Sequence, residues 1–121
     1  MEQIKITIPI RLPGLNEYID VCRGNKYAAS EFKQQIEDDC LIFIKADLRG
    51  RKFSSIGITF NWFEKDRKRD KDNICFAKKF ILDAMQKGRI LVNDGWSQIR
   101  YFRDEFYVDK NNPRVEVIIT P

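Results

Sequence analysis

The sequence predicts an α/β (α+β mixed) protein with a single mixed four-stranded sheet and two helices, in the order β-α-β-α-β-β. Two observations lead to this fold class. Apolar and polar residues alternate in four short segments, whereas apolar residues recur every three or four positions in two longer ones. With 121 residues, 43% of them hydrophobic, the chain can build one hydrophobic core but not two. We therefore expect residues 1–121 to form one domain.

The four expected strands each combine this alternation with β-branched or aromatic residues. The first spans residues 4–10, with isoleucine at every second position, and the second spans 55–63. The third lies near 98–106, and an Asn-Asn-Pro turn separates it from the fourth, at 114–120. Between the first strand and the first helix, residues 11–27 contain Pro-Gly and Gly-Asn pairs, so we expect this segment to be mostly loop.

The two expected helices span residues 31–47 and 74–87. Ser30 is the predicted N-cap of the first helix, and an apolar stripe faces the core while lysines, glutamines and acidic residues face water. Asp72 or Asn73 is the predicted N-cap of the second helix, and a glycine ends it. Helices of this length can cover one face of a small sheet, which completes the predicted fold.

The composition limits the classes of function that the chain can have. It contains no histidine, which excludes imidazole acid–base chemistry, histidine metal ligands and Ser-His-Asp or Cys-His nucleophiles. The three cysteines, Cys22, Cys40 and Cys75, form no C-x-x-C pair, so we expect reduced thiols and a cytoplasmic location. No apolar run approaches the length of a membrane span, and we expect neither a signal peptide nor a membrane partner.

A cluster of charged residues follows the second expected strand. Five of the seven residues 65–71 are basic, and Asp70 and Asp72 stand within or directly after this run. Side chains two residues apart lie on the same side of an extended segment, so the two carboxylates share a side. They also precede the second helix, whose N-terminus stabilises anions by about 0.3–1 kcal/mol. Asp94, in an Asn-Asp-Gly segment, supplies a third carboxylate.

This combination of charges indicates a chemistry. Carboxylates bind Mg²⁺ or Mn²⁺, and lysines and arginines bind phosphates. The net charge of +4 is only mildly basic, but its concentration beside the acidic residues is more informative. The residues therefore point to metal-dependent cleavage of nucleic acid.

Each of these residues also has a purely structural interpretation, which the pattern leaves open. An aspartate before a helix is often only a cap, and the Asn-Asp-Gly segment around Asp94 is typical of a simple turn. Lys79 lies almost two turns beyond Asp72 on the same helical face, where it can stabilise charge in a transition state. It can equally form a surface ion pair with Asp83, worth about 0.3–0.5 kcal/mol. Lys78 points about 100° away and is the weaker candidate.

Taken together, these residues resemble the RusA family of Holliday-junction resolvases, the crossover junction endodeoxyribonucleases of phages, prophages and bacteria. The similarity rests on four segments: Leu-Pro-Gly-Leu-Asn at 12–16, Arg-Asp-Lys-Asp-Asn at 69–73, Leu-Asp-Ala-Met at 82–85 and Asn-Asp at 93–94. The sequence departs from the family at two positions: Phe76 stands where the family has its catalytic lysine, and Asn93 replaces the first of two aspartates.

The resemblance implies a set of site residues. Asp70, Asp72 and Asp94 would be the catalytic metal ligands, and Lys79 would be the catalytic lysine of a helix about three residues longer. The neighbouring basic residues, which we expect to contact phosphates, are Arg67, Lys68, Arg69 and Lys71.

The resemblance also implies how the protein works. It would be a homodimer that uses Mg²⁺, with Mn²⁺ as a possible substitute, to resolve four-way (branched) DNA junctions by paired symmetric nicks during recombination and repair. Two alternatives remain open from the sequence. One is a non-catalytic DNA-binding module whose aspartates are only caps, and the other is a metal-dependent nuclease that acts on structured RNA.

Overall fold

A computed structural model describes residues 2–121 and confirms the predicted mixed four-stranded sheet. The strands are β1 (Ile4–Ile8), β2 (Ile56–Glu64), β3 (Ile99–Val108) and β4 (Arg114–Thr120). The helical segments are α1 (Leu15–Gly24), α2 (Lys26–Leu48), α3 (Lys71–Cys75) and α4 (Lys78–Lys87). The predicted element order is the observed one if α1 and α2 together are counted as the first expected helix, and α3 and α4 together as the second.

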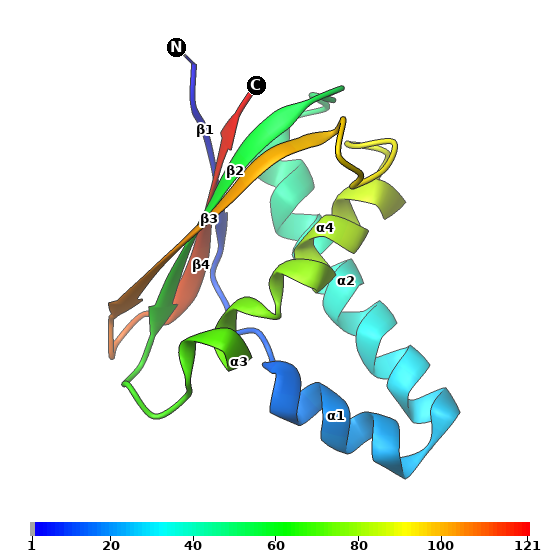
Figure 1. Cartoon of the computed structure of the whole chain (residues 1–121), viewed down its shortest axis with the longest axis vertical. Coiled ribbons are helices and arrows are strands. Elements are labelled where there is room, and N and C mark those ends of the chain that lie inside the picture. The colour runs from blue at the N-terminus through cyan, green and yellow to red at the C-terminus, as the bar shows by residue number, and fades with distance from the viewer. Residues whose placement is uncertain (1) are drawn as a thin grey trace.

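The strands lie side by side in the order β1-β4-β2-β3. β4 is antiparallel to both of its neighbours, whereas β2 and β3 are parallel. A parallel pair needs a long crossover connection, and α3 and α4 supply it. All four helical segments lie on the same side of the sheet, as Figure 1 shows, and no helix of residues 2–121 covers the opposite face. The two outer strands of the sheet are β1 and β3.

The hydrophobic core lies between this sheet and the helices. Alternate residues of each inner strand point into it, including Phe60 and Trp62 of β2, whose rings stack with centroids 5.5 Å apart. Cys40 and Ile44 of α2 and Met85 of α4 meet them from the helical side and are fully buried. Burying one such side chain stabilises the fold by about 1.5–3 kcal/mol, so these two layers hold each other in place.

The prediction that residues 11–27 are mostly loop is wrong, because α1 occupies 15–24 and α2 begins at Lys26. Asn25, not Ser30, is the N-cap of α2: its side-chain oxygen accepts hydrogen bonds from the backbone N–H groups of Tyr27 (2.8 Å) and Ala28 (3.2 Å). The Gly-Asn pair is therefore a junction between two helices. No residue of α1 is buried, which explains its weak sequence signal.

The second expected helix is divided. Asp70 is the N-cap of α3, in place of the predicted Asp72 or Asn73, although its side chain makes no capping hydrogen bond. A tighter turn, in which the Ala77 N–H donates to the Ile74 carbonyl (3.2 Å), separates α3 from α4. This break is stabilised by aromatic packing between the rings of Tyr18, Phe76 and Phe80, whose centroids lie 5.6–5.7 Å apart. No helix within residues 2–121 is long and apolar enough to span a bilayer.

Candidate active site

The charged segment predicted from the sequence connects β2 to α3. Glu64, the last residue of β2, is buried, and both of its carboxylate oxygens accept hydrogen bonds from the Arg69 guanidinium, from Nε and Nη2, each at 2.8 Å. Such a two-point contact between planar groups fixes both side chains. It closes residues 65–68 into a loop whose two ends are held together, and so fixes the start of α3.

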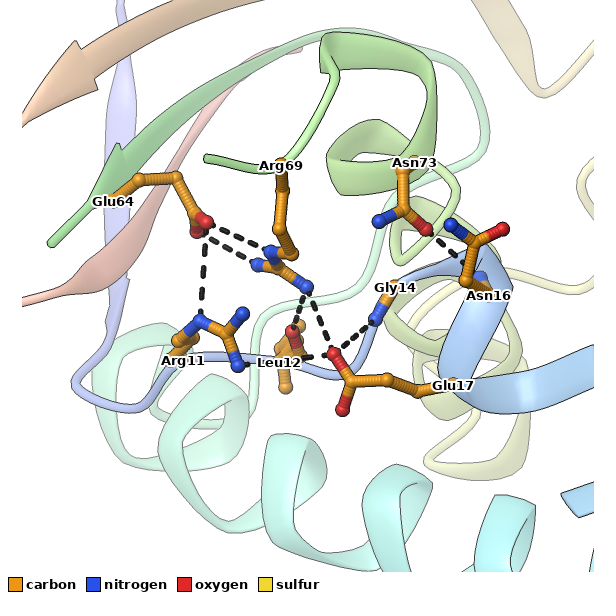
Figure 2. Close-up of polar contacts among 8 residues, drawn as sticks. All are labelled: Arg11, Leu12, Gly14, Asn16, Glu17, Glu64, Arg69 and Asn73. Carbon is orange, nitrogen blue, oxygen red and sulfur yellow. Dashed lines mark hydrogen bonds and ion pairs between the residues drawn. The ribbon is translucent and has the colours of Figure 1, made fainter. Parts of the chain in front are cut away.

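The same arginine also joins this loop to the N-terminal part of the chain, as Figure 2 shows. Arg69 Nη1 donates to the Leu12 carbonyl (3.2 Å) and to Glu17 Oε1 (3.3 Å). Arg11 lies between the two acids, 3.8 Å from Glu64 and 3.7 Å from Glu17. Because its guanidinium is fully engaged and its side chain is only 12% exposed, Arg69 positions the loop. The remaining predicted phosphate contacts, Arg67, Lys68 and Lys71, are exposed.

A second contact brings together two of the segments that carry the family resemblance. The side-chain oxygen of Asn73 accepts a hydrogen bond from the Asn16 backbone N–H at 2.8 Å (Figure 2). Gly14 packs so closely against α3 that a Cβ atom there would lie 2.7 Å from the Asn73 carbonyl oxygen and from its Oδ1. Only glycine fits at this point, so the start of α1 holds the start of α3.

Asp70 and Asp72 lie on the surface whose shape these contacts fix. Both are exposed, and the Asp70 carboxylate has no hydrogen bond or ion pair with any of residues 2–121. Asp72 accepts one hydrogen bond, from the Asn73 N–H at 3.0 Å. Both line a depression whose other walls are Glu64, Asp66, Arg67, Arg69, Lys71, Ile74, Phe106, Tyr107 and Val108. The sequence predicts an extended segment here, but Asp70 is the N-cap of α3 and Asp72 lies in its first turn. Their shared place on this depression therefore comes from the start of the helix and not from alternation along a strand.

Lys79 lies on a neighbouring depression that Asp72 also lines, together with Leu15, Tyr18, Lys33, Cys75, Phe76, Lys78 and Phe80. Its ammonium is 3.2 Å from Asp83, which is the predicted ion pair, and 3.9 Å from Asp94. The side chain is 53% exposed and can reach a ligand. A hydrogen bond to Asp83 raises the pKa of the nearby Lys33, which stays a cation on the same wall.

Lys78 has a different environment from Lys79. Its ammonium forms an ion pair with Asp104 of β3 and lies 5.5 Å and 5.0 Å from the ring centroids of Phe60 and Phe102. Asp104 also accepts a hydrogen bond from the Trp62 indole N–H at 2.9 Å. These contacts are internal, so of the two lysines Lys79 is the one that is available to a substrate.

The third predicted ligand, Asp94, does not share a depression with the other two. Asp94 lines neither depression and is linked to the site through Lys79. Within residues 2–121 no three acidic or cysteine side chains are grouped so as to hold a metal ion. Cys75 lies near Asp72, but burial raises the pKa of its thiol, which favours the protonated form over a metal-binding thiolate.

The donor chemistry of the first depression fits a hard divalent cation. Neither Asp70 nor Asp72 has an ion-pair partner among the described residues, and Mg²⁺ is commonly bound by one or two such carboxylates. The ion then retains several water molecules as its other ligands. Glu64, Phe106 and Tyr107 also belong to this surface, although no sequence motif marks them. They lie at the ends of two strands whose pairing no local pattern reveals.

Comparison with protein families gives a match to one of them. The family described as endodeoxyribonuclease RusA matches residues 22–120, which include Asp70, Asp72, Lys79 and Asp94. The matched range leaves out the segment 12–16, although that segment contacts α3. A comparison with curated protein sequences gave no match.

Proposed function

Since the chain belongs to the RusA endodeoxyribonuclease family, we propose that it is a Mg²⁺-dependent enzyme that resolves four-way DNA junctions by paired symmetric nicks. The observation that supports this best is that Asp70 and Asp72, which have no ion-pair partner among residues 2–121, line one depression with exposed basic side chains. The proposal includes a homodimer, because two strands must be cut at one junction. It also includes a role in recombination and repair of phage or prophage DNA.

In this proposal, Asp70 and Asp72 would hold the ion, and Asp94, which forms an ion pair with Lys79, would complete the ligand set. A bound Mg²⁺ would supply Lewis acidity and lower the pKa of a coordinated water. Lys79 would stabilise the negative charge that develops on the phosphate, since its side chain is exposed and lines the same depression as Asp72. Mn²⁺ would replace Mg²⁺ because it accepts the same oxygen ligands.

The basic residues divide into two roles. We assign phosphate contacts to Arg67, Lys68 and Lys71, which are exposed around the carboxylates. Arg69 positions the loop 65–68 and does not contact DNA itself, because its guanidinium donates hydrogen bonds to Glu64, Leu12 and Glu17.

One observation favours a second candidate, a DNA-binding module without catalysis. Asp94 forms an ion pair with Lys79, and residues 2–121 contain no ready cluster of three metal ligands. Binding of branched DNA would then need only the basic surface. Dependence of strand cleavage on the metal separates the two functions.

The decisive experiment incubates the protein with a synthetic mobile four-way junction, with and without Mg²⁺. Asp72→Asn is expected to abolish nicking while junction binding stays the same or tightens, because one negative charge facing the phosphates is removed. Asp20→Asn, the same change at an exposed position of α1, is the matched control and should cut normally. Cleavage by Asp72→Asn at the normal rate would contradict the catalytic assignment. Preferential cleavage of structured RNA in parallel reactions would assign the site to RNA.

Two further variants test the other proposed site residues. Asp94→Asn should abolish nicking if its carboxylate completes the ligand set, and normal nicking would reduce that set to two aspartates. Lys79→Ala should lower the cleavage rate without lowering the melting temperature, since its side chain is mostly exposed. Lys78→Ala should do the reverse, because it removes the internal partner of Asp104.

A further inference from the structure

β3 is an open edge of the sheet. It is ten residues long, pairs only with β2, and contains neither glycine nor proline. The opposite edge strand, β1, is shorter, and Asp47 covers part of it by accepting a hydrogen bond from the Thr7 backbone N–H at 2.8 Å. A long open edge offers a row of backbone groups to another strand, and proteins usually block such edges. The contrast between the two edges indicates that β3 has a partner.

The backbone groups that are free on this edge can be identified. The Asp109 N–H donates to the Glu64 carbonyl at 2.7 Å, so residue 109 directs its N–H group toward β2. Successive residues of a strand alternate in direction, and the register is continuous from 101 to 108. The N–H and C=O groups of Phe102, Asp104 and Phe106 therefore point to the open edge.

The sequence of this segment is nearly the same when it is read in either direction. Residues 101–107 read Tyr-Phe-Arg-Asp-Glu-Phe-Tyr, with Asp104 at the centre. The only positions that differ on reversal, Arg103 and Glu105, carry opposite charges. A strand with this pattern is complementary to a second copy of itself in antiparallel orientation.

The side chains of β3 remain exposed in the single chain. Tyr101, Phe102, Tyr107 and Val108 are 38–49% exposed, and they make up half of the large exposed hydrophobic residues found among 2–121. Arg103 and Glu105 have no ion-pair partner within that part of the chain. A monomer would leave this apolar and charged surface in water.

We propose that a second copy of this chain pairs with β3 in antiparallel orientation, about a twofold axis at Asp104, to give a continuous eight-stranded sheet. Opposite residues then have numbers that sum to 208, and even-numbered residues, whose backbone groups are free, exchange hydrogen bonds. Arg103 lies opposite the partner's Glu105, Tyr101 opposite the partner's Tyr107, and Phe102 opposite the partner's Phe106. Cross-strand pairs of these kinds are favourable.

The centre of this interface brings two copies of Asp104 together. In each copy the carboxylate is already bound by the Lys78 ammonium and the Trp62 indole N–H, so its charge is compensated within the subunit. Directly opposite residues of an antiparallel pair share a face of the sheet, so the helices of both copies lie on the same face. The two candidate active sites would then face one junction.

This inference deepens the proposed function by naming the surface of its homodimer, but it can be tested without DNA. Sedimentation equilibrium should show a dimer for the unaltered chain. Arg103→Glu and Glu105→Arg should each raise the dimer dissociation constant by about tenfold or more, since two symmetry-related pairs become like-charged. Lys52→Glu, a charge reversal at an exposed position outside β3, is the control and should leave the constant unchanged.

The two variants also allow a test of the geometry itself. An equimolar mixture of Arg103→Glu and Glu105→Arg chains restores opposite charges at both positions, so it should form heterodimers at close to the original affinity. The double variant, with both changes in one chain, should recover homodimers. A monomeric unaltered chain, or single variants that dimerise normally, would overturn the proposed interface. Junction cleavage is assayed separately, so loss of the nuclease proposal would leave this result unaffected.

Discussion

Replacing Arg69 by alanine distinguishes two roles for the most buried arginine of the basic segment. The sequence suggests a phosphate contact, whereas in the structure its guanidinium binds Glu64, Leu12 and Glu17. If the structural role is right, Arg69→Ala should mainly lower the stability of the protein. If Arg69 binds phosphate, the change should mainly lower the affinity for DNA.

The expected loss of stability follows from the burial of the pair. The side chains of Arg69 and Glu64 are only 12% and 10% exposed, and removing one partner of a buried pair costs about 3–5 kcal/mol. Arg11 remains 3.8 Å from Glu64, so we take the lower end, about 3 kcal/mol. Unfolding entropy of about 2.1 cal/mol/K per residue gives roughly 0.25 kcal/mol/K for 121 residues. The melting temperature should therefore fall by about 12 °C.

Thermal unfolding followed by circular dichroism measures this shift, and junction binding below the melting range measures the affinity. Lys68→Ala is the matched control, because Lys68 is the adjacent basic residue and is exposed. It should change stability by less than about 0.5 kcal/mol and should weaken DNA binding. An Arg69→Ala protein that melts like the unaltered chain and binds DNA as weakly as Lys68→Ala would refute the structural role.

Three other perturbations have defined outcomes. Gly14→Ala should destabilise the fold by about 1–3 kcal/mol in urea unfolding, because its Cβ would press on Asn73, whereas Gly24→Ala, with no atom within 4 Å, should not. Burial raises the pKa of the Cys40 thiol from 9.0 to about 12, so the unfolded chain loses that proton first. Stability should therefore decline above pH 9, by up to about 1.4 kcal/mol per pH unit, and the decline should be smaller in Cys40→Ala. Arg67→Ala should reduce the slope of log K for junction binding against log salt by about 1, and an unchanged slope would place the DNA elsewhere.

The strands could be predicted from the sequence because their signal is local. In β4, valines and isoleucines at alternate positions predicted residues 114–120, and the structure has the same bounds. α1 could not be predicted in this way, since it buries no residue and two glycine-containing pairs flank it. α1 is stabilised by contacts of the Tyr18 ring with aromatic rings from later segments of the chain. These rings belong to Phe32 of α2, Phe76 at the C-terminal end of α3 and Phe80 of α4.

The candidate site shows the same division. The sequence places Asp70 and Asp72 at the start of a helix, and the structure has them there, although Asp72 lies inside α3 and not in the extended segment that the spacing rule assumes. The role of Arg69 could not be predicted, because two of its partners, Leu12 and Glu17, are 57 and 52 residues away in the chain. The position of Asp94 likewise depends on how the loop after α4 packs, and no local rule predicts its ion pair with Lys79.

The sequence by itself determined which chemistry is available: no histidine, a run of basic residues, and aspartates that precede a helix. It also determined the four strands, since alternation along the chain is a local property. Only the tertiary structure decided that β3 lies at an edge of the sheet, that the Arg69 guanidinium binds Glu64, and that Asp94 forms an ion pair with Lys79. These outcomes depend on contacts between segments that are distant in the chain. No local sequence pattern selects such contacts, because they form only when the whole core packs.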